Sequence, residues 1–397
     1  MFTMAKIRDG STYLGEYLCP NDYYSEKEGV TGQWIGKGAE MLGLRGEIHA
    51  GDEAFENMRC NRLPDGSGKL TARDGENRIR FYDFQCSAPK SISIMGITLD
   101  DDRLIAAHDK AVRVAFGELE KFAACQNNTR TERITRTTGN VTAARFRHTS
   151  SRALDPQIHD HIVTVNATWD ESSRSWKALT EYEMLKAIRY AGKVYQNELA
   201  HSCMTLGYKI VEARDDKGTV TGFEIAGVSK ELIERFSKRR AEIEQEITSF
   251  KEEHGREPST REVGIISRTT RAEKLTQITN EEVIRRQRAQ CSALEWDGLQ
   301  AIKERATGCV PVSTNREREC LRIATAHLFE RRSVAFGHEV LAEALNQHLG
   351  SLDLSKLLHR LSDSSLVPLS EDERCPVLGP QRECNRNGGP WVSSMPP

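Results

Sequence analysis

The chain has 397 residues, of which 38% are hydrophobic and 29% are charged, as is ordinary for a soluble globular protein with room for more than one folded unit. It has no apolar run of signal-peptide or membrane-spanning length, and its ten cysteines include no CxxC pair. We therefore expect a cytoplasmic protein with reduced thiols and no membrane insertion. The formal net charge of −2 does not exclude a nucleic-acid partner, because a near-neutral chain can still carry a basic groove.

The first half of the chain mixes the patterns of strands and helices. Residues 79–86 alternate as a half-exposed strand does. Residues 102–124 carry apolar side chains at helical spacing with charged residues between them, and His108 lies on the apolar side of this predicted helix as a packed core residue. Residues 141–148 and 158–166 again predict strands, separated by a polar turn.

The second half is dominated by helical patterns. Residues 178–207 predict a helix, and a short hairpin around residues 216–218 follows it. Charge-laced helices begin near Ser229, which is typical of an N-terminal cap. Residues 316–361 have a helical apolar pattern of their own, and after residue 368 this pattern fades, so we expect a disordered tail.

Three histidines form the most specific signal in the chain. His159 and His161 alternate on one predicted strand and therefore project to the same face. His148 ends the preceding strand, and a turn of this length can return the chain antiparallel and bring the third imidazole alongside. An exposed strand that merely carries histidines is the alternative. The third histidine and the strand phase favour a site for a divalent metal that acts as a Lewis acid.

Tyrosines are concentrated at the start of the chain. Of nine tyrosines, Tyr13, Tyr17, Tyr23 and Tyr24 fall within the first two dozen residues, and Pro20 closes a turn after the first two. One interpretation is an aromatic staple over the sheet. Beside a triple-histidine metal site a nucleophile is favoured, since a phenolate attacks phosphorus when a base removes its proton and a cation neutralises the phosphate.

Two further strings of residues lie between the tyrosines and the histidines. Residues 33–44 read QWIGKGAEMLGL, and residues 83–91 read DFQCSAPKS. With the tyrosine-rich start and the histidine segment, in this order and spacing, the chain resembles the MobF conjugative relaxases, which are members of the HUH endonucleases. The resemblance covers about the first 300 residues, and residues 316–361 look like the start of the helicase region in full-length members.

The resemblance implies a fold and a division of the chain. It implies an α+β fold in which an antiparallel, palm-like sheet is flanked by helices, the HUH relaxase fold, with a helical C-terminal extension. Residues 1–300 would form the relaxase domain, residues 301–370 a helical segment resembling the start of the helicase region, and residues 371–397 the disordered tail.

The resemblance also implies a reaction. A tyrosine attacks one phosphodiester of single-stranded DNA at the transfer origin of a plasmid or conjugative element, leaving a 5′-phosphotyrosine link and a free 3′-hydroxyl, and a later transesterification rejoins the strand. The implied cofactor is a divalent metal, Mg or Mn, with Zn or Ni as alternatives in the same site. Accessory relaxosome proteins and a coupling protein are implied partners in plasmid mobilisation.

Four residues take their roles from matching family positions. His148, His159 and His161 hold the metal. Asp83 falls where the family has a carboxylate that orients a ligand histidine or assists deprotonation of the tyrosine, and strand phase is compatible with either role.

The chain departs from the family pattern at its first tyrosine pair, which is Glu16-Tyr17 here. Tyr17 is the first choice of nucleophile, because it lies in the window of that pair, and Tyr13 is an alternative. Tyr23 and Tyr24 form the intact second pair and would serve a second strand transfer.

Basic side chains and a missing motif complete the sequence picture. Arg145, Arg147 and Arg152 flank the predicted metal strands, and of these we assign a phosphate contact to Arg152. The chain has no GxxxxGK[ST] string, so we expect no ATP site in it.

Two rival functions remain open at this point. One is a rolling-circle replication initiator of the HUH type, against which the strings at residues 33–44 and 83–91 argue. The other is a catalytically decayed single-strand DNA-binding module, which the altered first tyrosine pair would fit.

Overall fold

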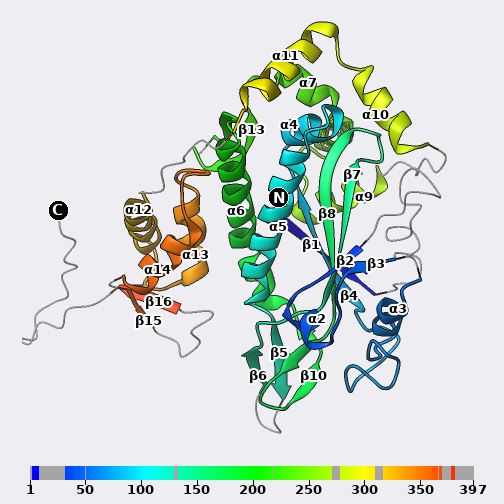
Figure 1. Ribbon diagram of the computed structural model, residues 1–397. Coiled ribbons are helices and arrows are strands. Elements are labelled where there is room, and N and C mark those ends of the chain that lie inside the picture. Colours follow the sequence, from blue (N-terminus) through cyan, green and yellow to red (C-terminus); the bar gives the residue numbers. More distant parts are fainter. Residues whose placement is uncertain are drawn as a thin grey trace, which may run out of the picture.

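The computed structural model describes residues 2–8, 32–49, 51–128, 133–216, 218–270, 278–308, 316–364, 366–368 and 377–380. At its centre lies a six-stranded sheet in the order β1-β4-β8-β7-β2-β3, in which every neighbouring pair is antiparallel (Figure 1). Its strands are Phe2–Ile7 (β1), Gly32–Ile35 (β2), Glu47–Ile48 (β3), Phe81–Ser87 (β4), Ala143–Ser150 (β7) and Pro156–Val165 (β8). Helices pack on this sheet, so the predicted α+β fold is confirmed.

Four smaller sheets, each separate from the central one, lie in the described residues. They are formed by Ala124–Asn128 (β5), Arg133–Thr137 (β6) and Leu179–Thr180 (β11); by Thr168–Asp170 (β9) and Ser175–Lys177 (β10); by Ile210–Arg214 (β12) and Val220–Ile225 (β13); and by Ala335–Phe336 (β14), Leu366–Pro368 (β15) and Val377–Pro380 (β16). The β12–β13 pair is the hairpin predicted around residues 216–218, and that prediction is confirmed.

The helices fall into three groups along the chain. The first half contains Lys37–Met41 (α2), Glu53–Arg59 (α3), Lys90–Ser93 (α4), the π-helix Ile94–Thr98 (η1), Asp102–Glu120 (α5) and Tyr182–Thr205 (α6). An arm follows with Lys230–Arg235 (α7), Lys238–His254 (α8), Thr260–Thr269 (α9), Asn280–Arg288 (α10) and Ala293–Arg305 (α11). The C-terminal helices are Glu317–Phe329 (α12), Gly337–Leu345 (α13) and Leu354–Ser362 (α14).

Both faces of the central strands are covered. Helices α5 and α6 pack on one face, where Phe84 and Ile162 belong to the larger hydrophobic core. On the other face Phe55 of α3 stacks on Phe81 with ring centroids 5.4 Å apart, within a smaller core. The prediction of a half-exposed strand at residues 79–86 is therefore wrong in its exposure, because Phe81 to Phe84 are all buried.

Two predicted helices are shorter than expected because neighbouring residues form strands instead. The helix expected over residues 102–124 ends at Glu120, because Ala124 begins β5. The helix expected from residue 178 begins at Tyr182, because Leu179–Thr180 pairs with β5. The strands expected over residues 141–148 and 158–166 are present as β7, which begins and ends two residues later, and as β8, which begins two residues earlier and ends one residue earlier.

The arm is anchored at the far end of the β7–β8 hairpin. Ser229 caps α7 as predicted, its Oγ accepting from the Leu232 N–H at 3.2 Å. Lys238 of α8 donates through Nζ to Asp155 Oδ1 at 2.7 Å, and Gln287 of α10 donates to the Leu154 carbonyl at 2.9 Å. In Figure 1 the arm crosses the top of the molecule and brings α10 beside the hairpin. Helices late in the chain thus hold the turn between the two histidine-bearing strands.

The C-terminal helices pack against α6. Asn197 of α6 is fully buried, donates to the Leu352 carbonyl at 2.7 Å and accepts from the Gly350 N–H at 3.0 Å. The extension is helical, as expected, and its apolar residues join the core that covers α5 and α6. Val377–Pro380 pairs with β14 and β15, which differs from the irregular tail expected over residues 371–397. None of the helices in the described part of the chain combines the length and apolar character needed to span a membrane.

Candidate active site

The structure brings the three predicted metal ligands together. In the β7–β8 pair His148 lies opposite His159, and His161 follows on the same face of β8. The ring centroids are 5.1 Å apart for His148 and His159, 5.3 Å for His148 and His161, and 5.4 Å for His159 and His161. His148 and His161 are buried and His159 is partly buried. We call these three residues the histidine cluster.

Two of the rings are oriented by hydrogen bonds at Nδ1. His161 Nδ1 lies 2.9 Å from Asp83 Oδ2, and His159 Nδ1 lies 3.0 Å from the Gln157 carbonyl oxygen. An N–H at Nδ1 donates to these oxygens and leaves the lone pair on Nε2, the arrangement found behind metal-bound histidines. The fully buried Asp83 also accepts from Gln85 Nε2 at 3.0 Å. Asp83 therefore contacts a ligand histidine, which is one of the two roles predicted for it.

The chemistry of this donor set fits a divalent metal ion. As the side chains stand, no group of three or more His, Cys, Asp or Glu residues in the described ranges is already arranged around one point. The three ring centroids lie within 5.4 Å of one another, so the imidazoles are close enough to share one ion. Burial, and next the neighbouring His161 ring, lower the pKa of His159 to about 4. The His159 ring is thus neutral near pH 7, the form that binds metal.

The arginines that flank the cluster in sequence do not share its surroundings. Arg145 and Arg147 alternate with the cluster along β7 and face α5, where both contact Asp109. Arg145 is only 4% exposed, and its guanidinium is engaged by Asp109 and Asp160. His108 is buried as predicted, but it also has polar partners, Tyr195 and Asp160.

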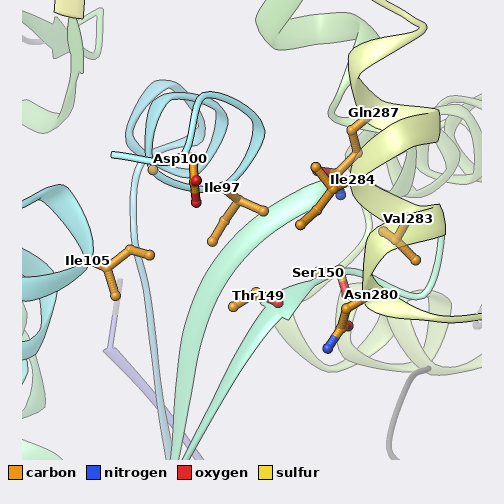
Figure 2. Close-up of a pocket in the computed structure, with 10 residues that line it drawn as sticks. Ile97, Asp100, Ile105, Thr149, Ser150, Asn280, Val283, Ile284 and Gln287 are labelled. Atoms are coloured by element: carbon orange, nitrogen blue, oxygen red, sulfur yellow. The ribbon is translucent and has the colours of Figure 1, made fainter. Parts of the chain in front are cut away.

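Arg152 lies in the turn between β7 and β8, where it is half-buried. A cavity of about 210 Å³ adjoins this end of the hairpin, directly after His148, between η1, α5 and α10 (Figure 2). It is lined by Gly96, Ile97, Asp100, Ile105, Thr149, Ser150, Asn280, Val283, Ile284 and Gln287. The end of the hairpin therefore meets the arm at a hollow with mixed polar and apolar walls.

Tyr13, Tyr17, Tyr23 and Tyr24 lie outside the described residues, so the predicted nucleophiles are not placed. The strand that follows them is informative. Gly32, the first residue of β2, pairs with Phe146, which in turn pairs with His161. The tyrosine segment therefore leads directly into a strand beside the histidine cluster.

The glycine string at residues 33–44 is architectural. Gly36 has φ +96°, and a Cβ there would lie 2.3 Å from the Val141 carbonyl oxygen. A Cβ on Gly38 would lie 2.7 Å from the Val141 carbonyl carbon. The buried Glu120 carboxylate accepts from the N–H groups of Lys37 at 2.7 Å and Val141 at 3.0 Å. The string thus packs the β2–α2 turn, in backbone contact, onto the start of β7.

The string at residues 83–91 ties β4 and α4 to the start of β8. Lys90 Nζ donates to the Pro156 carbonyl at 2.9 Å, and burial lowers the pKa of Lys90 to about 8. Ser91 accepts through Oγ from the Ile225 N–H at 2.7 Å. This string therefore places β8 as well as supplying Asp83.

Sequence reasoning missed Glu120 and the partners of Asp160, because nothing local to a carboxylate shows which distant backbone or guanidinium it will contact. The only signal was position: Asp160 stands between two predicted ligands, so strand alternation already placed it on the opposite face.

Comparison with known proteins agrees with the geometry. The family model described as TrwC relaxase matches residues 7–294. Two multifunctional conjugation proteins TraI are similar: one from Escherichia coli is 36% identical over 243 residues, 59% of this chain and 13% of the relative. The other, from strain K12, is 34% identical over 257 residues, which are 62% of this chain and 14% of that relative. The chain thus spans about one seventh of the length of these relatives.

Solved structures of the conjugative relaxase TrwC share the fold. A copper-bound complex with oriT DNA has a TM-score of 0.63 at 30% identity, covering 76% of this chain and 99% of that one. A metal-bound complex with oriT DNA has a TM-score of 0.62 at 29% identity, covering 73% of this chain and 96% of that one. With the family model matching well over half of its residues, the chain belongs to the TrwC relaxase family.

Proposed function

We propose that the protein is a metal-dependent DNA relaxase, which nicks and rejoins one strand of DNA at the transfer origin of a plasmid or conjugative element. The histidine cluster on β7 and β8, with Asp83 behind His161, carries the proposal. Family membership supports it, as do the TrwC structures that contain oriT DNA and metal.

The histidine cluster holds the divalent ion. The bound ion supplies positive charge that offsets the charge developing on the scissile phosphate. His159 and His161 present Nε2 because their Nδ1 atoms are engaged by Gln157 and Asp83. Asp83 is a positioning residue in this scheme, since its carboxylate contacts a ligand ring. We assign the ion as Mg or Mn, with Zn or Ni as alternatives that imidazole donors also accept.

The nucleophile is a tyrosine from the segment between β1 and β2. Its Oη forms a bond to phosphorus, the bond to the 3′-oxygen breaks, and the phenolic proton passes to solvent or a base while the 3′-oxygen gains a proton. The product is a 5′-phosphotyrosine link, which a 3′-hydroxyl reverses by the same path. Tyr17 attacks first, and Tyr23 and Tyr24 serve the second transfer.

The remaining assignments follow from this function. Single-stranded DNA at the transfer origin is the substrate, with Arg152 as a phosphate contact, and the reaction takes place in the cytoplasm. Accessory relaxosome proteins and a coupling protein are the partners. Residues 1–300 form the relaxase domain, residues 301–370 resemble the start of a helicase region, and residues 371–397 form the tail. No ATP site is assigned to the chain.

A covalent-adduct assay tests the function. The protein is incubated with Mn²⁺ and a pool of 3′-labelled single strands of randomised sequence, and a denaturing gel separates protein-linked DNA. We expect an adduct that does not form when a chelator is present from the start, with one sequence enriched in the linked strands. Binding of DNA without any adduct would instead identify a decayed DNA-binding module.

Tyrosine variants assign the nucleophile in the same assay. Phenylalanine keeps the ring and removes the hydroxyl, so it separates chemistry from packing. Tyr17→Phe should eliminate the adduct on a fresh strand, whereas Tyr23→Phe and Tyr24→Phe should only weaken it. Mass spectrometry of the linked peptide locates the nucleotide directly, and a nucleotide on Tyr23 or Tyr24 would reverse the assignment.

A further inference from the structure

A buried network of charged residues lies behind the histidine cluster, on the opposite face of β8. Asp160 stands between His159 and His161 in sequence, so strand alternation turns its carboxylate toward α5. Asp160 is fully buried, and its partner Arg145 is 4% exposed. A charge removed from water in this way is retained only where partners surround it.

The partners of Asp160 come from two elements, β7 and α5. Its Oδ2 accepts from Arg145 of β7 at 3.0 Å from Nε and 2.7 Å from Nη2. The same oxygen lies 3.1 Å from His108 Nε2 on α5, and His108 Nδ1 lies 2.7 Å from the Tyr195 hydroxyl on α6. Arg147 of β7 approaches Asp160 Oδ1 at 3.4 Å. The Asp160 carboxylate thus connects β8 to β7 and to α5, and His108 extends the connection to α6.

The network is placed where the strand pairing is irregular. The register of β7 and β8 shifts between His148 and Ser150, directly at the first ligand. A slip of one residue in a strand pair turns every side chain to the other face, which here would separate His148 from the two histidines of β8. Arg145 and Arg147 reach Asp160 from the regular side of this shift.

We propose that Asp160 is a positioning residue for the metal site. Its ion pairs with Arg145 and Arg147 hold β7 in register with β8, and its contact with His108 holds the pair against α5, so that the three imidazoles face one ion. The inference rests on the proposed function, because it assumes that the histidine cluster binds metal.

The test compares metal binding by the full chain and by Asp160→Asn, which keeps the shape and removes the charge. Co²⁺ alone, without DNA, is the probe, because its visible absorption reports the geometry of its ligands and calorimetry gives its affinity. We expect Asp160→Asn to weaken Co²⁺ binding about tenfold or more and to change the visible band. Thermal unfolding of each protein is recorded in parallel.

Asp170→Asn is the matched control. Asp170 is also a buried carboxylate, 1% exposed, and it pairs with Lys177 at 3.1 Å, but it lies on β9 outside the central sheet. Loss of its charge should lower stability and leave the Co²⁺ affinity and the visible band of the wild type. A similar loss of affinity in both variants would show a general effect of destabilisation and overturn the proposal.

If Asp160→Asn does not fold, a milder variant tests the positioning role of Asp160. Arg147→Met removes the ion pairs of Arg147 with Asp160 and Asp109 and keeps the aliphatic stem, while Asp109 keeps Arg145 at 2.5 Å and Arg113 at 3.2 Å. We expect a smaller but measurable loss of Co²⁺ affinity. If Asp160→Asn folds and binds Co²⁺ with wild-type affinity, the positioning role is overturned and the proposed function is not. The same holds if Asp160→Asn is unfolded and Arg147→Met binds Co²⁺ with wild-type affinity. Absence of Co²⁺ binding by the wild type would remove the metal site, and with it both proposals.

Discussion

The turn between β2 and α2 and the histidine cluster both border β7, but they differ in what their residues contact. At the turn, Gly36 and Gly38 meet the backbone of Val141, and the absence of a side chain is what matters. In the cluster, three imidazole rings lie within 5.4 Å of one another, and it is their nitrogen donors that matter. The two segments are comparably distinctive as sequence strings. Their comparison teaches that a specific string can mark architecture as readily as chemistry, and that geometry separates the two.

The largest expected effect is on the side of the cluster. His159→Ala removes one imidazole donor, so adduct formation should fall on the order of 10³-fold. The free energy of unfolding should change by less than about 1 kcal/mol, because the ring is only partly buried and its Nδ1 contact is with a single backbone carbonyl. Adduct gels and chemical denaturation measure the two quantities.

His327→Ala is the control for the histidine change. His327 is exposed on α12, where its Nδ1 lies 2.9 Å from Glu343, and it should lose neither activity nor stability. Undiminished adduct formation by His159→Ala would contradict the comparison, because the histidine cluster would then have no role in the reaction, like the turn between β2 and α2.

The second effect is on the side of the turn. Gly36→Ala should lower the free energy of unfolding by about 2–4 kcal/mol, because φ is +96° and the new Cβ would lie 2.3 Å from the Val141 carbonyl oxygen. Activity per folded molecule should persist at low temperature. Gly43→Ala, at φ +71° with open space around it, should cost only about 1 kcal/mol. Equal costs at the two positions would show that close approach to Val141 is unimportant.

The third effect sharpens the role of Asp83. Asp83→Asn weakens the hydrogen bond to His161 Nδ1, so metal affinity should fall about 10- to 100-fold, and excess metal should restore adduct formation. The loss should be the same at every pH between 7 and 10. A loss confined to neutral pH, and not rescued by metal, would assign Asp83 to deprotonation of the tyrosine instead.

The smallest effect concerns Glu120, which caps the turn. Burial raises the pKa of the Glu120 carboxyl above its ordinary value of 4.5. The folded state therefore holds this proton more tightly than the unfolded state, and the stability it contributes at low pH is lost as pH rises through the folded pKa. The stability advantage of the wild type over Glu120→Gln should thus be smaller at pH 7 than at pH 4.5. Denaturant unfolding at the two pH values measures it, and a constant difference would show that the pKa of Glu120 is the same in the folded and unfolded states.

Much of the candidate site could be predicted from the sequence because it depends on local periodicity. Alternation on a strand places His159 and His161 on one face whatever the rest of the fold does, and a short turn returns His148 beside them. The apolar spacing of residues 102–124 and the cap at Ser229 are local in the same sense. The order of the strings was enough to indicate the family, although the contacts they make, such as Gly36 with Val141 and Lys90 with Pro156, are distant in sequence.

Only the tertiary structure decided the rest, because it depends on contacts between residues far apart in sequence. Burial of β4 on both faces requires α3 as well as α5 and α6. Asp83 was compatible with two roles until pairing of β4 with β8 set it beside His161. Arg145 flanks the cluster in sequence, yet strand pairing turns it to Asp160 and Asp109 on the opposite face. Strand periodicity specifies which side chains share a face, but only packing determines what that face meets.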